Sequence, residues 1–105
     1  FVKMLTIGEQ IRKLREKNSL PLRKVAAELD IDQSILSKIE RGERKASKQQ
    51  VIQIANLFNV DKNELLINYL SDRVIYELRD DEELATKALK IAERKIKYTA
   101  KNRDG

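Results

Sequence analysis

The stretch from Leu20 to Gly42 constrains the fold of this chain more than any other part of its sequence. It holds two short segments with apolar residues at helical spacing, separated by the tight polar joint Asp30-Ile31-Asp32. Apolar residues at this spacing form one stripe along one face of a helix. The pattern therefore predicts two short amphipathic helices joined by a turn of a few residues.

The first of these segments is opened by Pro21, whose missing N–H would be unpaired in the first helical turn in any case. Its stripe follows the spacing i, i+3, i+4, i+7 and consists of Leu22, Val25, Ala26 and Leu29.

The second segment runs from Gln33 to Glu40 or Arg41, with Asp32 suited to the N-cap and Gly42 to the left-handed position after the helix. We expect Leu36 and Ile39 to face inward and Ile35 to be half covered. The outward side is polar and consists of Gln33, Ser34, Ser37 and Lys38. Two helices in this order, the second carrying side chains suited to base edges, have the layout of a helix-turn-helix, whose second helix enters the DNA major groove.

A resemblance extends over about two-thirds of the chain, from about Thr6 to Tyr69. Its motifs are Ile7-Gly8-Glu9-Gln10-Ile11-Arg12-Lys13-Leu14-Arg15, then Val25-Ala26, Leu29, Ile31, Ser34, Leu36, Ser37, Ile39-Glu40-Arg41-Gly42, and further Ile54-Ala55, Leu57-Phe58, Val60 and Glu64-Leu65-Leu66. In these positions the chain resembles the phage Cro/repressor family of helix-turn-helix regulators, also called the XRE family.

The resemblance implies roles for particular side chains. Gln33, Ser34 and Lys38 match positions that touch base edges in the family, and Ser37 shares their face. Arg41, Arg44, Lys45 and Lys48 match positions that touch phosphate. Arg15 and Glu40 match a partly buried ion pair between the first helix and the recognition helix. The chain departs from the family at Leu22, Asp30 and Ala46, where Gln, Gly and Pro are usual; one phosphate contact is therefore missing and strain is expected in the turn.

Composition limits the function further. The formal net charge is +5 and the sequence pI is about 9.5, which favours a polyanionic partner, although a charged helical surface explains such a charge equally well. The chain has no Cys and no His, which removes thiolate metal sites, disulfides and the commonest general base. We therefore expect no enzymatic activity, no metal and no cofactor. No membrane-spanning run or secretory signal is visible, so a cytoplasmic location is expected.

Helix-start signals recur along the rest of the chain. Capping boxes begin at Thr6, Ser47 and Asp61. With the two helices above they predict an all-α chain, containing a five-helix repressor-like DNA-binding domain with a helix-turn-helix over residues 5–70. Residues 1–3 and 101–105 are expected to be flexible ends, and Met4 is a candidate native start.

A helical extension is predicted over residues 71–100. Either one helix continues to about Arg79 or it breaks at Ser71–Asp72, and a last helix follows the acidic run from Asp80 to Glu83. Four carboxylates in a row could suggest a cation site, but acidic residues at a helix N-terminus are the stronger explanation. The predicted dimerisation residues are Leu70, Val74, Leu78, Leu84, Ala88 and Ile91.

The sequence thus predicts a double-stranded DNA-binding transcriptional regulator, of the repressor or restriction-modification controller type, that reads an inverted repeat as a homodimer. Three alternatives stay open for the C-terminal helices: they cap their own domain, add a basic DNA contact, or bind a protein partner as in an antitoxin-like module.

Overall fold

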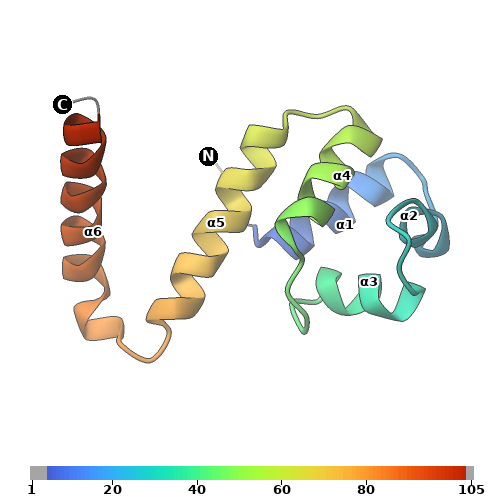
Figure 1. Cartoon of the computed structure of the whole chain (residues 1–105). Coiled ribbons are helices and arrows are strands. Elements are labelled where there is room, and N and C mark those ends of the chain that lie inside the picture. The colour runs from blue at the N-terminus through green and yellow to red at the C-terminus, as the bar shows by residue number, and fades with distance from the viewer. Residues whose placement is uncertain (1–4, 104–105) are drawn as a thin grey trace. The chain divides into compact units, whose positions relative to one another are not determined.

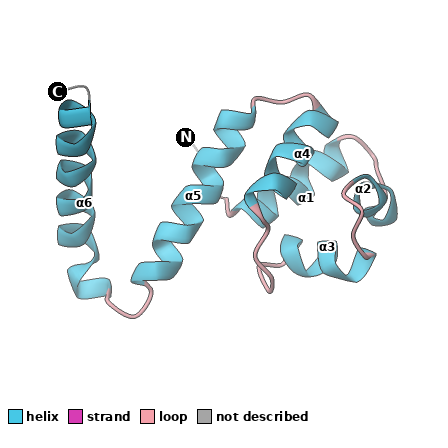
Figure 2. Cartoon of the chain, in the orientation of Figure 1, coloured by secondary structure: helices cyan, strands magenta, loops and turns pink. Residues whose placement is uncertain are grey.

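The computed structural model describes residues 5–103, and all regular structure in that range is helical (Figures 1 and 2). The six helices are α1 (Ile7–Lys17), α2 (Leu22–Glu28), α3 (Gln33–Glu40), α4 (Lys48–Phe58), α5 (Lys62–Leu78) and α6 (Glu82–Arg103). The all-helical prediction is confirmed. The predictions for residues 1–3, Met4 and residues 104–105 lie outside the described residues.

The chain divides into two compact units, with the division between Arg73 and Val74 inside α5. The first unit contains α1 to α4 and most of α5, and the second contains the end of α5 and α6. The sequence had suggested a boundary after Leu70 and had left open a break at Ser71–Asp72. The helix instead continues without interruption to Leu78.

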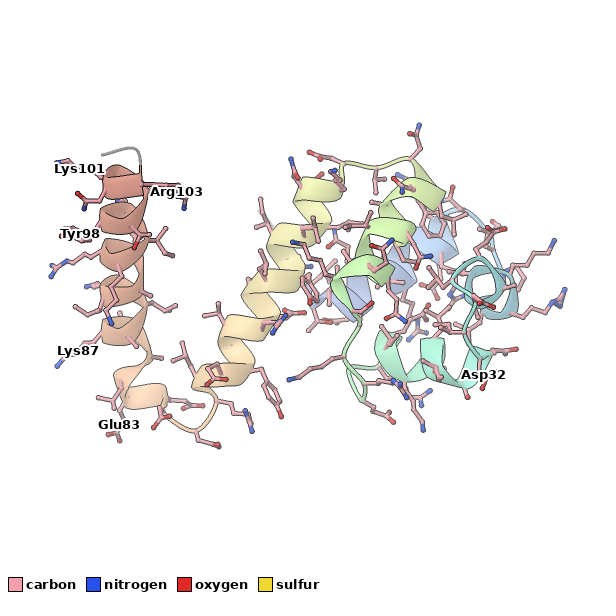
Figure 3. The ribbon with its side chains drawn as sticks, in the orientation of Figure 1. Asp32, Glu83, Lys87, Tyr98, Lys101 and Arg103 are labelled. Atoms are coloured by element: carbon pink, nitrogen blue, oxygen red, sulfur yellow. The ribbon has the colours of Figure 1, made fainter. Side chains whose placement is uncertain are left out.

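Local hydrogen bonds explain where the helices of the first unit begin. Thr6 and Ser47 each cap a helix through a complete capping box, in which Glu9 and Gln50 return the bond to the cap backbone. Asp61 Oδ1 accepts from the Asn63 N–H at 2.9 Å at the start of α5. Asp32 occupies the N-cap of α3 in an extended conformation but makes no capping hydrogen bond. The Asp32 side chain is exposed at the start of α3 (Figure 3) and does not accept a hydrogen bond from the first N–H groups of this helix.

Left-handed residues end four of the helices. Gly42 has φ +77°, and Ser19, Asp30 and Asn59 have φ between 53° and 56°. After α2, the Ile31 N–H donates to the Ala26 carbonyl at 3.0 Å, which is the long bond of a Schellman turn. A residue with a Cβ is less stable than Gly at positive φ. Asp30, where the resembling family usually has Gly, is therefore the strained position that was expected in the turn.

The core of the first unit is formed by apolar side chains from all five helices. Its fully buried members are Ile11, Val25, Leu36, Val51, Ile54 and Leu65. Leu36 and Ile39 are the inward residues of α3, and Ile35 is half-buried, as predicted. Burial of these side chains fixes α3 against α1 and α2 and leaves its other side open (Figure 1).

Polar contacts attach α5 to α1 within the same unit. The Asp72 carboxylate accepts from the Ile7 N–H at 2.7 Å, and Asn68 Nδ2 donates to Gln10 Oε1 at 2.7 Å. The first contact satisfies one of the N–H groups that an α-helix leaves unpaired at its start. Residues 71–73 therefore belong to the first unit and stabilise it.

The second unit lacks a core of its own. No residue from 74 to 103 is buried, and Leu78 and Ala85 are only half-buried. Residues 101–103, which the sequence analysis placed in a flexible end, are helical, because α6 continues to Arg103 and Asn102 Nδ2 donates to the Tyr98 carbonyl at 2.9 Å.

Candidate nucleic-acid interface

The outer face of α3 carries the candidate base-reading residues. Gln33, Ser34 and Lys38 are exposed, whereas Leu36 and Ile39 on the opposite side are 0% and 3% exposed. Ser37 shares the outer face but is half-buried. The helix is eight residues long and is fixed by its apolar side, so it presents its polar side chains as a preformed surface.

Ser37 is held by Arg41 at the end of this face. Arg41 Nη1 donates to Ser37 Oγ, and Arg41 Nε donates to Glu43 Oε2 at 2.6 Å. The hydrogen bond to Glu43 raises the pKa of Arg41, and the same bond lowers the pKa of Glu43. Arg41, which the sequence assigned to phosphate contact, is thus already paired within the chain.

The other three candidate phosphate ligands lie beyond α3. Arg44 and Lys45 are in the loop that follows Gly42, and Lys48 is the first residue of α4. All three are exposed. They extend the positive surface from the end of α3 to the start of the next helix.

Arg15 and Glu40 form the bidentate pair that ties α1 to α3. Arg15 Nε and Nη2 donate to the two carboxylate oxygens of Glu40 at 2.8 Å and 3.0 Å, and Nη1 donates to the Leu20 carbonyl at 3.1 Å. The side chains are 15% and 5% exposed. The hydrogen bond to Glu40 raises the pKa of Arg15.

Gly8 lets the two helices approach closely at the same place. A Cβ on Gly8 would lie 2.2 Å from the Ile39 carbonyl oxygen and 3.0 Å from that of Glu40. Both atoms belong to the backbone at the end of α3, so they cannot move aside like a flexible side chain. The absence of a side chain at Gly8 therefore helps to set the position of the candidate recognition helix.

The role of Glu43 was not predicted from the sequence. The sequence feature that could have indicated this role is a carboxylate directly after Gly42. At that position a left-handed turn brings the chain back toward the end of the helix. Two apolar residues of the C-terminal surface, Ile75 and Leu89, were also not predicted. They are exposed in the second unit together with the predicted Val74, Leu84, Ala88 and Ile91, and Ile96 and Tyr98 are exposed there as well. The predicted Leu70, in the first unit, is also exposed, and Leu78 is half-buried.

Within residues 5–103, no group of three or more His, Cys, Asp or Glu side chains is arranged to hold a metal ion. No helix in the same range is long and apolar enough to cross a membrane.

Comparison with known families decides the class of the chain. Residues 8–71, more than half of the sequence, match the model of a helix-turn-helix domain. The chain belongs to this helix-turn-helix family. No curated protein and no solved structure matches it. The matched residues include α1 to α4 and most of α5, and the family marks the chain as a DNA-binding regulator.

Proposed function

We propose that this helix-turn-helix protein is a sequence-specific transcriptional regulator of the Cro/repressor type, with α3 as its recognition helix. The observation that carries the proposal is the division of α3 into a buried apolar side and an exposed polar side. Gln33 matches the edge of adenine and Lys38 matches guanine, and Ser34 and Ser37 add short hydrogen-bonding groups between them. No catalytic role is proposed for any residue.

Phosphate contacts come from Arg44, Lys45 and Lys48 in this proposal. Contacts to phosphate fix the register of a protein on the duplex, and contacts to base edges specify the sequence. The exposed basic residues after α3 are suited to the first task, because each neutralised phosphate releases condensed counterions. Arg41 is not among these proposed phosphate contacts, because its guanidinium is paired with Glu43.

The base-reading proposal is tested by selecting bound duplexes from a random pool and then titrating variants on the selected site. Gln33→Ala and Lys38→Ala are each expected to cost about 1–3 kcal/mol on this site and to relax the preference at one base position. Lys13→Ala, an exposed lysine on α1, is the matched control for loss of charge. Equal weakening on selected and random DNA by both α3 variants would exclude them as base readers.

The second unit is proposed to form a homodimer. Val74, Leu84 and Ile91 are 42%, 59% and 44% exposed, and none of the described residues of this unit, 74–103, is buried. A helical segment of this kind is stable only when its apolar face is covered. A two-fold interface with a second copy covers it and places two recognition helices about 34 Å apart on an inverted repeat.

Sedimentation equilibrium tests the dimer with two charge-altering variants of α6. Ile91→Glu is expected to give monomers and to weaken binding to the whole inverted repeat by orders of magnitude, because the second half-site no longer adds its effective concentration. Lys90→Glu adds the same acidic group at a neighbouring exposed position and is the control. A monomeric full-length chain would contradict the homodimer and favour a different protein as the cover of this face.

A further inference from the structure

The turn after α3 places Glu43 beside the recognition helix. The Glu43 N–H donates to the Lys38 carbonyl at 2.9 Å and the Gly42 N–H donates to the Ile39 carbonyl at 3.1 Å. These are the two bonds of a Schellman turn, and Gly42 supplies its left-handed residue with φ +77°. The turn reverses the chain, so the Glu43 side chain meets Arg41 at the end of the outer face.

The guanidinium of Arg41 is engaged on both sides. Glu43 accepts from Nε at 2.6 Å and from Nη2 at 3.4 Å, and Ser37 Oγ accepts from Nη1. Arg41 is 50% exposed and Glu43 is 55% exposed, so the pair lies at the surface. The hydrogen bond from Arg41 lowers the pKa of Glu43, and the positive charge of Lys38 contributes in the same direction.

We propose that Glu43 is a specificity-determining residue, which holds Arg41 in an internal ion pair and so withholds it from the phosphates of unselected DNA. The inference rests on the proposed DNA-binding function of α3. A free arginine beside a phosphate releases counterions and strengthens binding to every sequence. An arginine paired with a carboxylate brings no net charge to the duplex, so binding to random DNA gains little from it.

On a selected site the pair stays formed and orients Ser37. The Ser37 hydroxyl oxygen accepts from Arg41, so its proton is directed to another acceptor, such as N7 of a purine in the major groove. Loss of Glu43 therefore affects the two kinds of DNA differently. It frees Arg41 to contact phosphates in loose complexes with random sequences, which raises the affinity for random DNA. The affinity for a selected site rises less, because base contacts already position the protein there.

Fluorescence anisotropy titrations of the full chain on a selected duplex and on a random duplex, at several salt concentrations, test this inference. Glu43→Gln is expected to tighten binding to random DNA about two- to five-fold near 0.1 M salt, the range expected for an exposed ion pair. It should also steepen the salt dependence by about one unit for the phosphate gained. The affinity for the selected site should change less, so that the ratio of the two affinities falls.

Two comparisons separate this mechanism from a general effect of charge. In an Arg41→Ala background, Glu43→Gln should have no further effect, because Glu43 acts through Arg41. Glu16→Gln removes the same charge from the pair with Arg12 on α1, whose side chains are similarly exposed at 55% and 58%, and it should leave the affinity ratio unchanged.

Three results would overturn the inference. They are equal tightening on both duplexes, an undiminished gain in the Arg41→Ala background, and a gain of the same size with Glu16→Gln. A wild-type chain that binds neither duplex would instead contradict the proposed function itself. Binding by the wild-type chain with any of the three results rejects only the role of Glu43.

Discussion

Arg15→Met is expected to destabilise the first unit strongly. The change keeps an apolar stem of similar length but removes both hydrogen bonds to the Glu40 carboxylate and the bond to the Leu20 carbonyl. Glu40, with a side chain only 5% exposed, then has lost its cationic partner inside the protein. Breaking a buried pair from one side costs about 3–5 kcal/mol, and the 15% exposure of Arg15 places this pair near the lower limit.

The expected loss of about 3 kcal/mol corresponds to a fall in Tm of about 12–24 °C for a unit of this size. Urea and thermal unfolding, followed by circular dichroism at the helical band, measure it. Arg12→Met is the matched control on the same helix, because Arg12 pairs with Glu16 at 3.4 Å with both side chains more than half exposed. Its expected cost is below about 0.5 kcal/mol.

The double variant Arg15→Met/Glu40→Leu distinguishes an unpaired buried charge from lost packing. Replacing both members by apolar residues of similar volume should recover much of the stability, since no buried charge is left without a partner. The reasoning is refuted if Arg15→Met melts at the same temperature as Arg12→Met. It is also refuted if the double variant is less stable than Arg15→Met alone.

Three further predictions concern single residues of the first unit. Gly8→Ala should lower the free energy of unfolding by about 1–3 kcal/mol in urea titrations, because the added Cβ meets the Ile39 carbonyl. This loss is expected despite the higher helix propensity of Ala, and a variant as stable as the wild type would contradict the close approach of α1 to α3. Asp30→Gly should raise Tm by the equivalent of up to about 1 kcal/mol, since Gly adopts φ +56° without strain, and a lower Tm would show that the Asp30 side chain stabilises the turn. An NMR titration of the Glu43 carboxyl should give a pKa below its ordinary value, rising toward that value in Arg41→Ala. Because the pKa is lowered in the folded chain, the pair stabilises it above the ordinary glutamate pKa, and this contribution is lost as pH falls through the lowered value; an unchanged pKa in Arg41→Ala would contradict the pairing.

Local sequence signals were sufficient to locate the helices of the first unit. The capping boxes at Thr6 and Ser47 form as predicted, and the left-handed positions at Gly42 and Asn59 end their helices. These features depend on residues three or four positions apart, so the sequence contains all of their partners. The helix-turn-helix prediction was confirmed by the match to its family because it rests on the same local spacing.

Two kinds of contact could not be predicted from the sequence. One joins residues far apart in the chain, and the other depends on the geometry of the turn after α3. The partner of Asp72 is a backbone N–H at the start of α1, and no local pattern indicates that contact. The sequence shows a basic residue at position 41 and an acidic one at 43, but the turn geometry decides that they pair and that Ser37 joins them.

The sequence by itself therefore determined where the helices of the first unit begin and which side of α3 is polar. The tertiary structure decided how closely α1 approaches α3 at Gly8, that Asp72 of α5 accepts from the start of α1, and where the first unit ends within α5. The physical reason is the range of the interactions. Helix formation and capping are set by near neighbours in the chain, whereas packing distances and ion pairs depend on how separate helices and turns meet in space.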